Sequence, residues 1–236
     1  MWVISKRTIL VVAVIILTAV TAAICFTAIN GGSAGADKSG LTVVLDAGHG
    51  GIDGGVTGVN TGVKESELNL LIVKKLRDYL EDAGFKVVLT RSSDAGLYGL
   101  ATSGLKRKDM EKRRDIIVKA NPALVVSVHL NKYSVSSRRG AQVFYKAGDE
   151  NGKKLAESIQ EEFNGMDTSE RAFSALTGDY YILNCTDYPS VIAECGFLSN
   201  PEDESLLVTE EYRDSLCYSM FKGIVRYIAE SAEGAA

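Results

Sequence analysis

The chain contains two histidines, His49 and His129, and each stands where an apolar segment runs out into a polar loop. These segments are residues 41–46 (LTVVLD) and 124–128 (LVVSV). Neutral imidazole is the commonest protein ligand of zinc, and a catalytic site adds a third protein ligand and leaves one position for water. A lone histidine is more often a structural residue, but two at matching strand ends predict a metal site.

A carboxylate near these histidines would complete the set of three ligands. Glu65 and Glu67 both stand at the start of a predicted amphipathic helix, and spacing alone does not choose between them. A glutamate in the first turn is also favoured by the helix dipole without any metal. Glu65 is the candidate ligand, with Glu67 as the open alternative.

Glu194 ends the apolar segment 190–194 (SVIAE). Burying an unpaired carboxylate is expensive, so such a residue is paired with a cation, protonated or functional. Beside a metal it would act as the general base that activates water. The alternative is a salt bridge to a nearby arginine or lysine. Asp46 either orients His49 or caps the loop that follows it.

Residues 48–55 (GHGGIDGG) form a glycine-rich stretch that superficially resembles a nucleotide-binding loop. Asp53 stands where a dinucleotide fingerprint needs its third glycine, and no Gly-Lys-Ser/Thr of a P-loop is present. The glycines are better explained by close approach of the backbone to a metal and a bulky substrate.

Hydrophobic periodicity predicts the elements that position these residues. We expect strands at 41–46, 86–90, 124–129, 141–145 and 190–194, and helices at 65–84, 107–120, 151–163 and 211–228. The alternation predicts an α/β fold with a mostly parallel sheet flanked by helices on both faces. Residues outside the carboxyl ends of such strands can meet in one site. Residues 165–178 lack a period and are expected to form a loop over the site.

Length and composition suit one catalytic domain at 41–230, followed by a short tail at 231–236. The net charge of -4 argues against a nucleic-acid partner. The four cysteines form no CxxC pair and are expected to pack as small apolar residues.

Residues 8–29 are uncharged and long enough to cross a membrane. Lys6 and Arg7 precede them, so residues 1–7 are expected in the cytoplasm and the domain outside it. Residues 30–40 would form a flexible linker. The length of the apolar run favours a retained anchor, while the alternative is a cleaved signal peptide and a secreted domain.

Four features together resemble the type 3 family of zinc-dependent N-acetylmuramoyl-L-alanine amidases. They are residues 45–55 (LDAGHGGIDGG), Glu65, residues 127–131 (SVHLN) and residues 192–200 (IAECGFLSN). The resemblance covers about 41–228. It implies one Zn²⁺ held by His49, Glu65 and His129, with Glu194 as the catalytic glutamate. Two departures, Ala47 and Leu130, touch none of these residues.

The resemblance also implies the substrate, which is the amide between the lactyl group of N-acetylmuramic acid and L-alanine in peptidoglycan. His-Leu-Asn, one membrane segment and no wall-binding repeats look most like the spore-cortex branch of the family. That branch starts muramic lactam formation, in the space between forespore and mother cell. An activating protein partner is a further expectation. The alternatives are a catalytically silent scaffold for wall enzymes and a zinc peptidase or deacetylase.

Overall fold

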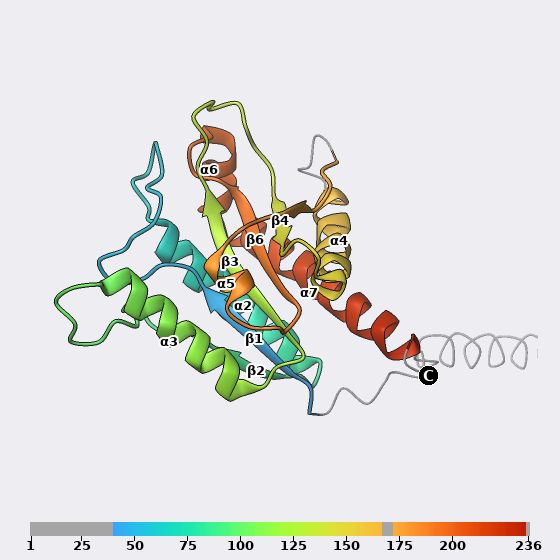
Figure 1. The fold of residues 1–236 in the computed structure, drawn as a ribbon. Helices are drawn as coiled ribbons and strands as arrows, with labels where there is room; N and C mark the ends of the chain where they lie inside the picture. The colour runs from blue at the N-terminus through green and yellow to red at the C-terminus, as the bar shows by residue number, and fades with distance from the viewer. Residues whose placement is uncertain (1–39, 167–171, 235–236) are drawn as a thin grey trace, which may run out of the picture. The chain divides into compact units, whose positions relative to one another are not determined.

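The apolar runs of the sequence form one six-stranded sheet in the computed structural model, which describes residues 40–166 and 172–234 (Figure 1). The strand order is β2-β1-β3-β6-β4-β5. The strands are β1 (Thr42–Ala47), β2 (Lys86–Leu89), β3 (Leu124–Asn131), β4 (Gln142–Tyr145), β5 (Leu176–Thr177) and β6 (Ser190–Phe197).

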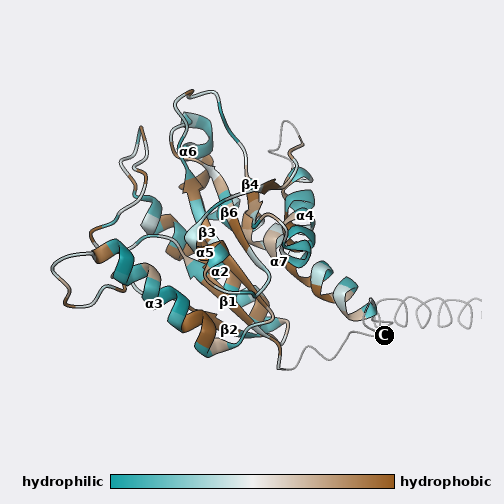
Figure 2. Cartoon of the chain, viewed as in Figure 1, coloured by the Kyte–Doolittle hydropathy of each residue, from teal (hydrophilic) through white to brown (hydrophobic). Residues whose placement is uncertain are grey.

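Helices cover both faces of the sheet, as the alternation of strands and helices predicts. One face packs against α2 (Glu65–Asp82), α4 (Glu150–Asn164) and α7 (Glu210–Glu233), and the other against α3 (Leu105–Ala120) and α5 (Tyr181–Asn184). Successive side chains of β1 divide between the two layers: Val43 and Leu45 join the larger core, and Val44 joins the smaller one. The central strands β1, β3 and β6 are accordingly buried almost throughout, and Figure 2 shows that the strands of the sheet are largely hydrophobic.

The sheet is mixed. Strands β2, β1, β3 and β6 run parallel to one another. Strand β4 pairs antiparallel with β6, and β5 pairs parallel with β4. The prediction of a mostly parallel sheet thus holds for its larger part. The sequence pattern of β4 could not reveal its direction, because direction depends on the path of the connecting chain.

The chain reverses its direction of winding between β1 and β3. From β1 it moves outward to β2, then returns across β1 to form β3 on the other side. Ligands in open α/β sheets bind at such a switch point, outside the carboxyl ends of the strands. His49 follows β1 and His129 lies near the end of β3, so the topology places both histidines at this point.

Three short elements were absent from the sequence-based prediction. Strand β5 lies at the sheet edge within the segment expected to be a loop, and α5 and α6 (Pro201–Leu207) flank β6. Elements of two to seven residues are too short to show a period. Asn200 caps α6 by accepting hydrogen bonds from the backbone N–H groups of Glu202 and Asp203.

The predicted membrane anchor at residues 8–29 and the linker at 30–40 lie outside the described residues, except for Gly40. Among residues 40–166 and 172–234, no helix has the length and apolar character needed to span a bilayer.

Candidate metal centre

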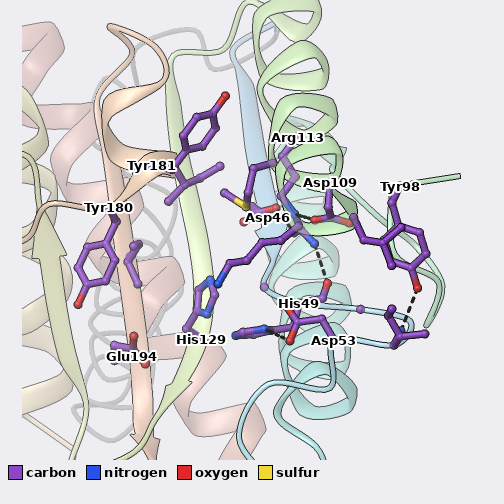
Figure 3. A pocket seen from close by; sticks show the side chains of 18 of the residues that line it. Asp46, His49, Asp53, Tyr98, Asp109, Arg113, His129, Tyr180, Tyr181 and Glu194 are labelled. Carbon is purple, nitrogen blue, oxygen red and sulfur yellow. Dashed lines mark hydrogen bonds and ion pairs between the residues drawn. The ribbon is translucent and has the colours of Figure 1, made fainter. Parts of the chain in front are cut away.

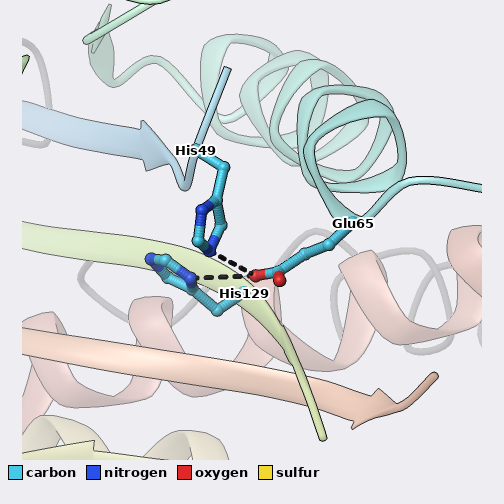
Figure 4. Close-up of side chains that lie close together, drawn as sticks. All are labelled: His49, Glu65 and His129. Carbon is cyan, nitrogen blue, oxygen red and sulfur yellow. Dashed lines mark hydrogen bonds and ion pairs between the residues drawn. The ribbon is translucent and has the colours of Figure 1, made fainter. Parts of the chain in front are cut away.

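Three side chains from three different elements converge at the switch point (Figure 4). Nε2 of His49 lies 3.1 Å from Oε1 of Glu65, and Nδ1 of His129 lies 3.0 Å from the same oxygen. All three donor atoms lie within 4.8 Å of one another. The structure therefore brings together His49, Glu65 and His129, the three residues that the sequence analysis grouped.

The spacing of these donors fits a small tetrahedral ion. Zinc bonds to nitrogen and oxygen are about 2.0–2.1 Å long, so two ligands of a tetrahedral ion lie about 3.3 Å apart. The distances from the two histidine nitrogens to Oε1 of Glu65 are shorter than this by at most about 0.3 Å. Small rotations of the side chains would make up this difference. Two imidazoles and one carboxylate also leave the fourth position open, as in catalytic zinc sites.

The structure distinguishes Glu65 from Glu67. Glu65 is buried at the first turn of α2, whereas Glu67 is exposed to solvent. The Glu65 carboxylate accepts hydrogen bonds from the backbone N–H of Val56 at 2.8 Å and of Leu130 at 3.1 Å. Burial by itself would raise its pKa, but the hydrogen bonds to His129 and His49 outweigh burial and lower the pKa below its usual range.

The loop after β1 holds His49 in an unusual backbone conformation, with φ at 62°. This left-handed region is uncommon outside glycine, so surrounding contacts must maintain it. Oδ1 of Asp53 lies 2.9 Å from Nδ1 of His49, on the opposite side of the ring from Glu65. Burial would lower the pKa of His49, but Glu65 and Asp53 together raise it. A carboxylate in this position fixes the orientation of a ligating imidazole.

Asp46 does not orient His49 directly. Its carboxylate accepts hydrogen bonds from Arg113, Thr90 and Ser127, each at 2.6 Å. Burial opposes ionisation of Asp46, but these three partners together lower its pKa to about 2. Arg113 in turn donates to the carbonyl oxygen of His49 at 2.6 Å, so Asp46 contacts the metal-binding loop only through this arginine.

Glu194 lies beside the cluster because β6 pairs with β3, with Glu194 opposite His129 in the register. Its Oε2 is buried and has no hydrogen-bond partner among the described residues. Burial raises the pKa of Glu194 to about 7. The salt bridge that was the alternative role for this residue is absent from the part of the chain that the structure describes.

A cavity of about 600 Å³ opens beside the cluster, and His49, His129 and Glu194 all line it (Figure 3). Residues of α3 form one side and Asp179 to Ile182 form the other. Tyr180 and Tyr181 were not predicted, because they lie at the N-cap and the first residue of a helix of only four residues. The loop at 165–178 was expected over the site, but none of its described residues lines the cavity.

The fold and the site together define an α/β protein with a cluster suited to a metal ion, and beside it a cavity and a lone carboxylate. The chain belongs to the N-acetylmuramoyl-L-alanine amidase family, whose model matches residues 43–226. That match spans every strand and helix on which the donor residues and Glu194 lie.

Known relatives agree with this assignment. The germination-specific N-acetylmuramoyl-L-alanine amidase of Bacillus subtilis is 35% identical over 199 residues, which is 83% of each protein. The structure of the CwlD amidase from Clostridioides difficile, solved in complex with the GerS lipoprotein, matches with a TM-score of 0.78 and 35% identity, over 80% of this chain and 99% of that one. The amidase AmiC2 of Nostoc punctiforme matches with a TM-score of 0.69 and 30% identity, over 80% and 98%.

Proposed function

We propose that this chain is a zinc-dependent amidase that hydrolyses the bond between the lactyl group of N-acetylmuramic acid and L-alanine in peptidoglycan. The observation that carries the proposal is the convergence of His49, Glu65 and His129 beside a cavity that is lined by both histidines and by Glu194. Membership of the amidase family supports peptidoglycan as the substrate and this amide as the bond that is cleaved.

In this proposal His49, Glu65 and His129 hold one zinc ion through Nε2, Oε1 and Nδ1. A bound zinc ion supplies Lewis-acid polarisation of the substrate carbonyl and a water molecule of lowered pKa. Oδ1 of Asp53 lies against Nδ1 of His49, and the hydrogen bonds of Glu65 with the two histidines keep the Glu65 carboxylate ionised despite its burial. A metal ion binds neutral imidazole, so zinc binding would release the proton that Glu65 and Asp53 favour on His49.

Glu194 is the proposed proton carrier. A group that accepts a proton from water and returns it to the leaving amine works best with a pKa near the working pH. The raised pKa of Glu194, about 7, and its unpartnered buried oxygen both suit this role. The carboxylate also lines the same cavity as the two histidines, so a substrate amide bound there is within its reach.

We further propose that residues 41–230 act outside the cytoplasm, tethered by the segment at 8–29 and the linker at 30–40. The similarity to the germination-specific amidase of B. subtilis supports a role in the spore cortex. Because the similar CwlD amidase was solved with a lipoprotein, an accessory protein partner belongs to the proposal as well.

The test is digestion of purified peptidoglycan by the metal-loaded protein, with mass spectrometry of the products. We expect stem peptides with a free L-alanine amino group and glycan strands with free lactyl groups, and neither from Glu194→Gln. Elemental analysis of the same samples should find zinc in both proteins. Zinc-loaded protein that releases no stem peptide would indicate a silent scaffold, and cleavage of another bond would indicate a peptidase or deacetylase.

A further inference from the structure

Arg91 is a buried arginine two residues beyond the end of β2, with only 3% of its surface exposed. Its guanidinium donates to four backbone carbonyl oxygens, and no carboxylate of the described residues forms an ion pair with it. The acceptors are the carbonyl oxygens of Ala47 at 2.9 Å, Gly48 at 2.9 Å, Ser66 at 2.8 Å and Ser93 at 3.0 Å.

Three of these four carbonyls belong to the segments that supply two of the three donor residues. Ala47 and Gly48 lie immediately before His49, and Ser66 immediately follows Glu65 in the first turn of α2. Nη2 of Arg91 alone bridges the carbonyls of Gly48 and Ser66. One rigid side chain therefore fixes the spacing between the loop of His49 and the helix start of Glu65.

The charge balance argues against a role in packing alone. Arg113 also binds this loop, but Asp46 and Asp109 neutralise its charge through ion pairs of 2.6 Å. Arg91 forms no direct ion pair with a carboxylate of the described residues. Burial and the charge of Arg113 lower its pKa, and the charges of Asp46, Asp94 and Asp109 offset this only in part. Burying a charge without a direct ion pair is expensive, and an apolar side chain would avoid that cost. What an apolar residue cannot do is donate hydrogen bonds to four backbone carbonyls at once.

We infer that Arg91 is a positioning residue of the metal centre, which sets the separation of His49 Nε2 and Glu65 Oε1 before any ion binds. The inference rests on the proposed function, because it takes zinc as the ion that this site binds. Preorganisation of this kind affects metal affinity, because a ligand pair that is not held at the right spacing must be ordered during binding.

The test compares Arg91→Lys and Arg91→Met with the unmodified protein and a matched control. Lysine keeps the charge but loses the planar fork, and methionine keeps the volume without charge. Arg226→Lys is the control, because Arg226 also donates to a backbone carbonyl, that of Ser158 at 2.7 Å, and joins α7 to α4 away from the cavity. Zinc affinity is measured by competition with a chromophoric chelator, and folding by circular dichroism.

We expect both Arg91 variants to bind zinc about 10–100-fold more weakly, the range found when partners of metal ligands are removed. Arg226→Lys should keep the parental affinity. The visible spectrum of cobalt-substituted protein gives a second readout, because it reports the coordination geometry: it should change in Arg91→Lys and not in Arg226→Lys. If Arg91→Met does not fold, Arg91→Lys alone carries the test. Its zinc affinity is then measured in concentrated sucrose, which favours the folded state.

Folded Arg91 variants with parental zinc affinity and an unchanged cobalt spectrum would overturn the inference. A parent protein that binds no zinc would instead refute the proposed function, so the two failures are distinguishable.

Discussion

Replacing Gly48 with alanine should remove His129 from the metal centre without unfolding the protein. A Cβ atom on Gly48 would lie 2.3 Å from Cε1, 2.4 Å from Nε2 and 2.6 Å from Nδ1 of the His129 ring. Non-bonded carbon atoms prefer separations of about 3.5–4.0 Å, so the ring must move by about 1.2 Å or more. Gly48 does not have a positive φ, so alanine brings no backbone strain of its own.

A ring displacement of this size exceeds what a zinc site tolerates, since bond lengths vary by only about 0.2 Å. We therefore expect zinc affinity to fall by about 100-fold or more, which corresponds to about 2.8 kcal/mol or more of binding free energy. The free energy of unfolding of the zinc-free protein should fall by about 1–3 kcal/mol, as for other overpacked sites.

The assay is chelator competition for zinc, with urea unfolding of the zinc-free protein beside it. Gly165→Ala is the matched control, because a Cβ there would make ordinary contacts of 3.6 and 3.7 Å and Gly165 ends α4 away from the cavity. Parental zinc affinity in folded Gly48→Ala would refute the reasoning that His129 is a ligand held at this place by close packing.

Three further predictions follow from the site. Glu194→Gln should retain zinc by elemental analysis while peptidoglycan hydrolysis falls by about 10²–10⁴-fold, and substantial turnover by the metal-loaded variant would remove Glu194 from the mechanism. Asp53→Asn should weaken zinc binding about tenfold, since Asp53 contacts His49, and an unchanged affinity by chelator competition would contradict that role. The pKa of Asp46, about 2 in the folded state against 3.8, should contribute about 2 kcal/mol of stability above pH 4, lost as the pH falls through 2. Urea unfolding of Asp46→Asn and its parent should therefore differ most near neutral pH, and a difference that persists below pH 2 would exclude the ionised carboxylate as its source.

Much of the fold could be predicted because its strands and long helices have clear periods. The apolar runs at β1, β3 and β6 are buried on both faces, and the charged positions of α2 mark its solvent side. The direction of β4 and the existence of β5, α5 and α6 depend on tertiary contacts rather than on local pattern. Their sequences are too short for periodicity to decide.

The two histidines of the candidate site could be predicted, because histidine is rare in this chain and each one stands at the end of an apolar segment. The choice between Glu65 and Glu67 also had a signal in the sequence: Glu65 shares the helical face of Leu68 and Ile72, whereas Glu67 shares the exposed face of Leu71. The role of Arg91 had no such signal, because its partners are backbone carbonyls and any sequence provides those.

The three donor residues of the candidate metal centre come from separate parts of the chain, and Glu65 and His129 are 64 positions apart. No local segment can therefore capture the ion, and β1, α2 and β3 must all be assembled first. In the proposed function, the free energy of zinc binding would therefore stabilise only the complete domain. A chain cut between α2 and β3 and separated into fragments would lose this stabilisation.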